Sequence, residues 1–138
     1  MGLSLEDAQI QTKTAQGSYL ELRLLKISGE RQLKHVQGSA QTSEITNQMQ
    51  GELDAVKAKY GDEPSSEEYR QYMAECESIE NEYTLQLEVV RDQMTAAEDR
   101  LDTQQEVVET RLEVINAEIE QWKEARDNTV ENTCAYFQ

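Results

Sequence analysis

Proline, aromatic residues and basic residues are all scarce in this chain of 138 residues, and each shortage excludes a class of protein. The single proline, Pro64, leaves long stretches on either side free to form uninterrupted helices. Aromatic residues make up 6% and apolar residues 37% of the chain. Even with the six glycines added, this falls short of the ~45–50% of ordinary globular domains. The apolar residues must therefore lie in stripes and not in one large compact core.

Positive charge is also scarce, because 28 acidic and 13 basic side chains give a net charge of −15. Such a chain is poorly suited to nucleic acid, whose phosphates need Lys and Arg partners, and to anionic membrane surfaces. The imbalance lies in the second half: residues 1–62 carry 7 basic and 8 acidic side chains, and residues 63–138 carry 6 and 20. We expect no nucleic-acid partner.

Long apolar runs are absent, since none approaches the ~18 residues of a membrane span. We therefore expect no membrane insertion. The start, MGLSLE, lacks the basic and apolar regions of a signal peptide. Glu6 stands where the myristoylation pattern requires Ser or Thr. We expect an extracellular or cell-surface location reached without a cleaved signal peptide; a cytoplasmic location is the alternative.

Residues with catalytic or metal-binding chemistry are equally few. His35 is the only histidine and has no cysteine or carboxylate at metal-ligand spacing. Metal sites in helical bundles use inward-facing Glu-x-x-His pairs, and the clustered glutamates of the second half have no such histidine. No Gly-rich phosphate loop is present. We expect no catalytic residue, no cofactor, no metal and no enzymatic activity.

One clear break divides the chain at residues 61–64. Gly61 suits the position just after a helix has ended. Pro64 stops that helix from continuing. Ser65 and Glu68 fit a capping box at the start of the next helix. The break thus predicts a short loop between a helix over about 4–60 and a second helix over about 65–132.

The second half has a strong helical period. Apolar residues step by three or four from Tyr69 to Trp122, and fifteen steps over 53 residues give about 3.53 residues per turn. Only Gln105 interrupts the stripe. The period predicts one helix over 65–132, followed by a tail over 133–138. The packing positions predicted on this helix are Leu87, Met94, Leu101, Val108, Ile115 and Trp122.

The first half is less regular. Ser4 with Asp7 predicts a helix start. An apolar stripe at 3.6-residue spacing begins at Leu22, and a second stripe continues it after a slip of one residue. The predicted packing positions are Leu22, Leu25, Leu33, Val36, Ala40, Ile45 and Met49. Alternating residues within 19–36 leave a β-hairpin open as an alternative, although an isolated hairpin is marginal in water.

Two long helices joined by a short loop fold back antiparallel. The predicted fold is therefore all-α: a long antiparallel two-helix hairpin, coiled-coil-like and extended rather than globular, forming one domain over 1–138. Such a hairpin buries one stripe on each helix and little more. Partner chains are the natural source of the missing burial.

The two cysteines are Cys76 and Cys134. Along a continuous helix they lie about 87 Å apart, whereas a disulfide requires Cα atoms within about 7 Å. They cannot pair within one subunit, and disulfides between chains remain open.

The chain resembles small exported helical subunits: the terminal helices of flagellin and the needle and filament subunits of type III secretion. The matching features are the amide- and hydroxyl-rich stretch Gln37-Gly38-Ser39-Ala40-Gln41-Thr42-Ser43, the long stripe over 87–122 and the missing signal peptide. The two cysteines, the acidic second half and the aromatic end depart from flagellins. The resemblance implies a bacterial, self-assembling extracellular filament exported by a secretion machinery.

We accordingly expect a structural subunit that packs against copies of itself into a filament or tube. The end of the tail supplies two further candidate contacts, Tyr136 and Phe137. The alternative is a coiled-coil adaptor or chaperone of a secretion or assembly system, which would hold a partner and remain monomeric or dimeric.

Overall fold

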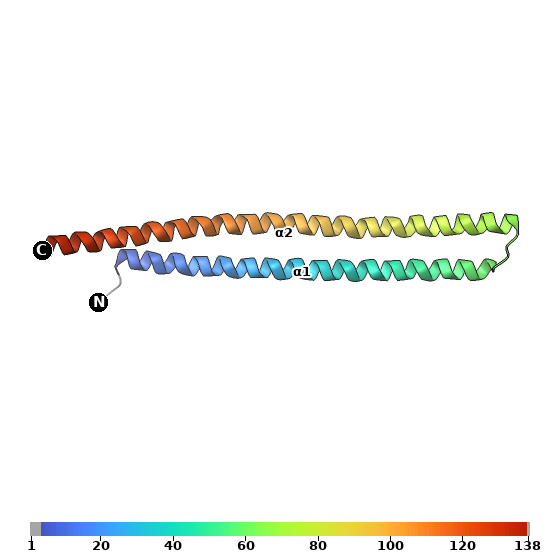
Figure 1. Cartoon of the computed structure of the whole chain (residues 1–138), viewed down its shortest axis with the longest axis horizontal. Helices are drawn as coiled ribbons and strands as arrows, with labels where there is room; N and C mark the ends of the chain where they lie inside the picture. Colours follow the sequence, from blue (N-terminus) through green and yellow to red (C-terminus); the bar gives the residue numbers. More distant parts are fainter. Residues whose placement is uncertain (1–3, 138) are drawn as a thin grey trace. The chain divides into compact units, whose positions relative to one another are not determined.

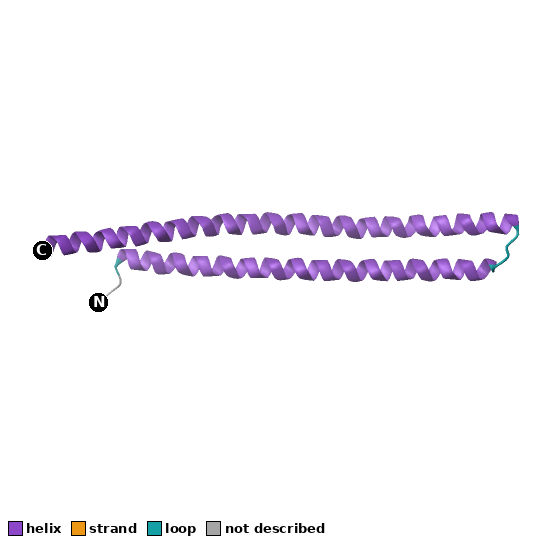
Figure 2. Ribbon diagram, in the orientation of Figure 1, coloured by secondary structure: helices purple, strands orange, loops and turns teal. Residues whose placement is uncertain are grey.

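The computed structural model describes the backbone of residues 4–137 and the side chains of residues 4–133. It contains two helices, α1 (Leu5–Tyr60) and α2 (Ser66–Phe137), joined by a short loop (Figure 1). Figure 2 shows no strand in this part of the chain. The predicted all-α helical hairpin is confirmed. The β-hairpin alternative over 19–36 is wrong, because these residues lie inside α1.

The helix ends follow the predicted capping residues. The Asp7 backbone N–H donates to Ser4 Oγ at 3.1 Å, and the Glu68 backbone N–H donates to Ser65 Oγ at 3.3 Å. Gly61 has a φ of +74°, a left-handed conformation that glycine adopts without steric cost. Its N–H donates to the Lys57 carbonyl at 3.0 Å and closes the last turn of α1.

α2 continues beyond its predicted end. The prediction ends the second helix at about residue 132 and places a tail over 133–138, whereas the helix extends to Phe137. No proline or glycine follows Pro64, so nothing in the sequence obliges α2 to stop earlier. The side chains of Cys134, Tyr136 and Phe137 lie outside the described residues.

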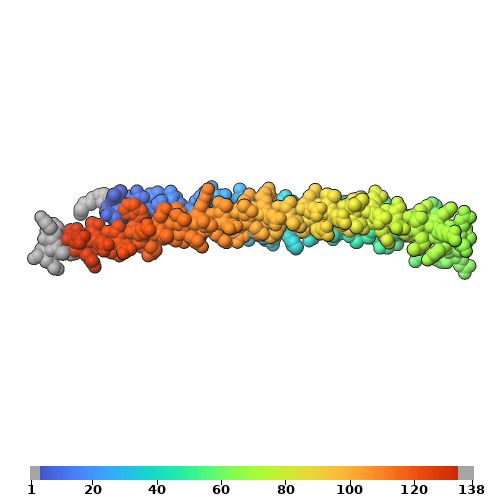
Figure 3. All heavy atoms as spheres, turned by 90° about the horizontal axis from the view of Figure 1, so that it is seen from above, coloured from blue at the N-terminus to red at the C-terminus, as the bar shows by residue number. Residues whose placement is uncertain are grey.

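Two compact units can be distinguished, and each contains a segment of both helices. Unit 1 combines the chain up to Glu30 with the chain from Arg100 onward, and unit 2 comprises Arg31–Asp99. Within each unit the α1 and α2 segments run antiparallel, side by side (Figure 1). In the space-filling view the side chains of α2 lie in front of those of α1 (Figure 3).

Unit 1 holds a continuous apolar core. Four buried side chains form it, two from α1 and two from α2: Leu20, Ile27, Leu101 and Val108. Leu24, Leu112 and Ile115 are half-buried and pack against this cluster. An ion pair between Lys13 Nζ and Glu118 Oε2, 2.5 Å apart, lies in the same unit.

Unit 2 is held together by a thinner set of contacts. Tyr83 and Val90 are its buried large apolar side chains. Burial and a hydrogen bond to Glu52 raise the pKa of the Tyr83 phenol, the hydrogen bond having the larger effect. Gly38 is buried against Met94, whose Cγ would lie 2.8 Å from a Cβ at this position. Arg31 forms an ion pair with Glu98.

The predicted packing positions fall into two groups that differ in burial. Leu87, Met94, Leu101, Val108, Ile115 and Trp122 of α2, and Ile45 and Met49 of α1, are all buried or half-buried. The stripe predicted from Leu22 to Ala40 does not face α2. Leu22, Leu25, Leu33, Val36 and Ala40 are exposed.

The physical reason for the difference is that this part of α1 carries two apolar rows. At about 100° per residue, Leu22 and Leu25 project from the side of the helix opposite to Leu20 and Ile27. The row that faces α2 in unit 1 includes a glycine, Gly17, which is buried beside Leu112 and Ile115.

Candidate assembly surfaces

Among the described residues, the side chains with intrinsic chemical reactivity do not lie together. His35 is exposed, and Cys76 is a half-buried free thiol. In the part of the chain that the structure describes, no group of three His, Cys, Asp or Glu side chains is placed to hold a metal ion. Over the same residues, neither helix combines the length and the apolar character needed to cross a membrane.

An aromatic and ionic cluster lies next to the loop in unit 2. The Tyr60 and Tyr72 rings meet edge to face with centroids 5.9 Å apart. The Glu75 Oε1 atom accepts hydrogen bonds from Lys59 Nζ and from the Tyr60 hydroxyl, both at 3.1 Å. This cluster ties the end of α1 to the start of α2, and its groups are paired with one another.

Hydrogen bonds shift the pKa values of the groups in and beside this cluster. The hydrogen bond from Lys59 lowers the pKa of Glu75 from its ordinary value. The same hydrogen bond raises the pKa of Lys59. The hydrogen bond with Cys76 raises the pKa of Tyr72. Each shift reflects a local contact of the hairpin, so we assign the cluster a structural role.

Exposed apolar side chains are the most prominent surface feature. Six apolar side chains are buried, whereas thirteen large ones are exposed by 45–70%, counted over the described residues. In unit 1, Leu22 and Leu25 project from α1, away from the core. In unit 2, Leu33 and Val36 do so. The hairpin alone thus leaves most of its large aliphatic surface in water, which is an unfavourable arrangement for an isolated chain.

The outward face of α2 carries apolar side chains that the seam prediction did not include. In unit 2 these are Leu85 and Val89, and in unit 1 Val107 and Val114, of which Val114 also borders the groove described below. A signal was present in the sequence, because Val107 and Val114 are one heptad apart and off the predicted seam. This second row is hard to recognise in the sequence because the inward stripe is stronger.

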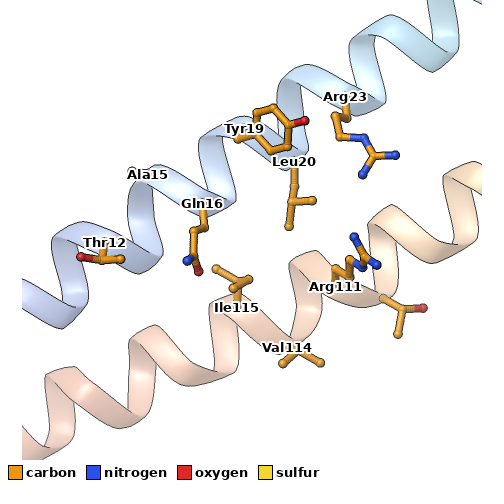
Figure 4. A pocket seen from close by; sticks show the side chains of 10 residues that line it. Thr12, Ala15, Gln16, Tyr19, Leu20, Arg23, Arg111, Val114 and Ile115 are labelled. Carbon is orange, nitrogen blue, oxygen red and sulfur yellow. The ribbon is translucent and has the colours of Figure 1, made fainter.

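A groove runs between the two helices of unit 1 and opens to solvent (Figure 4). Its volume is about 770 Å³. Leu20 and Arg23 point from α1 toward α2, and Arg111 and Ile115 point back toward α1 (Figure 4). Ten residues line the groove: Thr12, Ala15, Gln16, Tyr19, Leu20, Arg23, Thr110, Arg111, Val114 and Ile115.

The charge of this groove is opposite to that of the chain as a whole. Arg23 and Arg111 are its only ionisable lining side chains apart from the Tyr19 phenol. Neither guanidinium has an ion-pair partner within the described residues. The adjoining hollow in the same unit is lined by Arg23, Lys26 and Arg100, with Glu30 as its one carboxylate. The groove therefore combines apolar walls with unneutralised positive charge.

Comparisons with protein-family models, with curated proteins and with solved structures find no match for this chain.

Proposed function

We propose that this chain is a structural subunit that assembles with copies of itself through side-by-side packing of its helices. The observation that carries the proposal is the outward apolar surface of α1, where Leu22 and Leu25 in unit 1 are exposed by 64% and 70%. Burying a leucine side chain completely is worth roughly 1.5–3 kcal/mol. Repeated along the helices, this gain offsets much of the free energy that association costs.

The distribution of charge supports the same proposal. The first 62 residues are nearly neutral, with 7 basic and 8 acidic side chains, so neighbouring copies can approach α1 with little repulsion. The acidic side chains are concentrated on α2, where mutual repulsion limits further lateral association. The extracellular filament or tube, and its export by a secretion machinery, rest on the resemblance to exported filament subunits.

The test is the oligomeric state of the full chain. Sedimentation velocity over a range of concentrations should show growth beyond the dimer, and negative-stain microscopy should show regular particles. A chain that remains monomeric or dimeric at the highest concentration would contradict the proposal and favour the adaptor or chaperone alternative.

A paired substitution tests the surface that carries the proposal. The double variant Leu22→Glu, Leu25→Glu should raise the concentration needed for assembly at least about tenfold, which corresponds to a loss of ~1.4 kcal/mol. The control, Gln121→Glu with Asn128→Glu, adds the same number of acidic side chains at exposed positions of α2 in unit 1, away from the Leu22 and Leu25 surface. The control should assemble as readily as the parent chain.

A further inference from the structure

The groove of unit 1 combines apolar walls with two positive charges, a chemistry that suits an apolar and negatively charged occupant. Its walls are formed by Tyr19, Leu20, Val114 and Ile115. Arg23 is half-buried beside them and Arg111 faces it across the groove (Figure 4). Two like charges close together repel each other unless a counter-charge lies between them. The chain itself places no carboxylate among the groove-lining residues.

One surface of the same chain has the matching chemistry. Leu85 and Val89 lie one helical turn apart on α2 and are exposed by 63% and 54%. Glu82 and Glu88 flank them, are exposed, and have no ion-pair partner among the described residues. Asp92 lies one turn further on and is paired with Arg91 at 3.8 Å. We call this surface the Leu85–Val89 face.

Other exposed apolar side chains fit the groove less well. Val107 and Val114 lie on the groove's own helix segment, beside Arg111. Leu33 and Val36 adjoin Lys34, so they would bring like charge to the arginines. Of the three exposed aliphatic pairs compared, the Leu85–Val89 face is the one flanked by two carboxylates without ion-pair partners among the described residues.

We infer that the groove of unit 1 binds the Leu85–Val89 face of a second copy of this chain. Leu85 and Val89 of the second copy enter the apolar part, and its Glu82 and Glu88 neutralise Arg23 and Arg111. Carboxylate–guanidinium pairs at such a site select the partner and its register as well as contributing affinity. This contact rests on the proposed self-assembly and defines one interface of the assembly.

A charge-exchange experiment tests the contact. One variant carries Arg23→Glu and Arg111→Glu, and the other carries Glu82→Arg and Glu88→Arg. Each variant alone should need at least about tenfold more protein to assemble, because its groove and its face then have the same sign. An equimolar mixture should assemble within about twofold of the parent chain, because each altered groove finds a face of opposite charge.

Two controls make the result specific. Lys34→Glu with Arg70→Glu changes the net charge as much as the groove variant, at exposed positions of unit 2, and should leave assembly unchanged. Circular dichroism should show parental helical content for every variant.

The outcomes separate this contact from the general proposal. If the parent chain assembles and the groove and face variants alone assemble equally well, the contact is wrong and self-assembly stands. Variants that assemble poorly and are not rescued by mixing would also overturn it. A parent chain that never assembles would overturn both.

Discussion

At the scale of single residues, one tight contact between the two helices in unit 2 depends on a missing side chain. Gly38 is buried, and an added Cβ would lie 2.7 Å from Met94 Cε and 2.8 Å from Met94 Cγ. Gly51 occupies the same helix in the same unit, but nothing lies within 4 Å of a Cβ added there. Both glycines lower the helix propensity of α1 equally, but only Gly38 makes room for a side chain of α2.

Alanine at these two positions should have opposite effects. Gly51→Ala should stabilise the fold by up to about 1 kcal/mol through helix propensity alone. Gly38→Ala gains the same propensity but overpacks the contact with Met94, for a net loss of about 1 kcal/mol. Thermal unfolding followed by circular dichroism measures both. Stabilisation by both substitutions would show that the Met94 side chain moves aside at little cost.

The pair Lys59–Glu75 should make stability depend on pH in a defined direction. The pKa of Glu75 is lowered from 4.5 in the folded chain. Its contribution is therefore fully present above that pH and is lost as the pH falls through the lowered value. The pKa of Lys59 is raised from 10.5, so the contribution persists until strongly alkaline pH.

The variant Glu75→Gln should therefore be less stable than the parent chain at neutral pH and equally stable in acid. Melting temperatures of both proteins, measured from neutral to acidic pH, should converge as the pH falls below 4.5. Glu77→Gln, at an exposed position nearby, is the control. A constant difference between parent and variant at all pH values would contradict the assignment.

At the scale of the elements, α2 was the more predictable helix. Its step of three or four residues identified the inward positions from Tyr72 to Trp122, because one strong stripe dominates that helix. On α1 the same periodicity rule selects the outward row. Leu22 and Leu25 give a stronger apolar signal than Gly17, which faces α2 but has no side chain.

Periodicity shows that an apolar row exists but does not show which neighbour covers it. On α1 the choice between two rows depends on the fit to the partner helix. Small residues such as Gly17 and Gly38 allow that close fit, and a hydrophobicity pattern does not register them. The groove of unit 1 could not be predicted from the sequence either. Arg23 and Arg111 are 88 positions apart in the chain, and periodicity within one helix does not show which residues of two helices meet.

Neighbouring valines on α2 provide a direct test of the inward face. Val108 is fully buried in the core of unit 1, and Val107 is 45% exposed. Val108→Ala should destabilise the fold by about 2 kcal/mol, from lost burial and the cavity left behind. Val107→Ala should change stability by less than about 0.5 kcal/mol.

The measurement is denaturant unfolding at a concentration where the chain is monomeric. Equal losses from the two valine variants would contradict the inward face assigned to Val108.

At the scale of the whole molecule, the two units differ in how their contacts are made. Unit 1 has a core of four buried apolar side chains. Unit 2 has Tyr83 and Val90 as its buried large apolar side chains, together with the loop-proximal ion pair. Stability is seldom uniform across a structure, and regions with fewer buried contacts open more readily.

Hydrogen exchange should therefore be slower in unit 1 than in unit 2. Peptides from the segments that contain Leu20 and Val108 should retain deuterium protection longest, because they share the larger core. Mass spectrometry of the monomeric chain after timed exchange measures this directly. Uniform protection along both helices would show that the two units open together as one cooperative domain.

The separation of the groove from the Leu85–Val89 face has a consequence for symmetry. The groove belongs to unit 1 and the face to unit 2, so the inferred contact joins two unlike surfaces. A twofold axis would make this contact twice between the same two copies, groove to face and face to groove, and would close a dimer. Growth beyond the dimer therefore requires a different operator, under which each copy that fills its groove still offers a free face to a third copy. Addition then continues until a rotation closes a ring, or without limit as a helical polymer with two different ends.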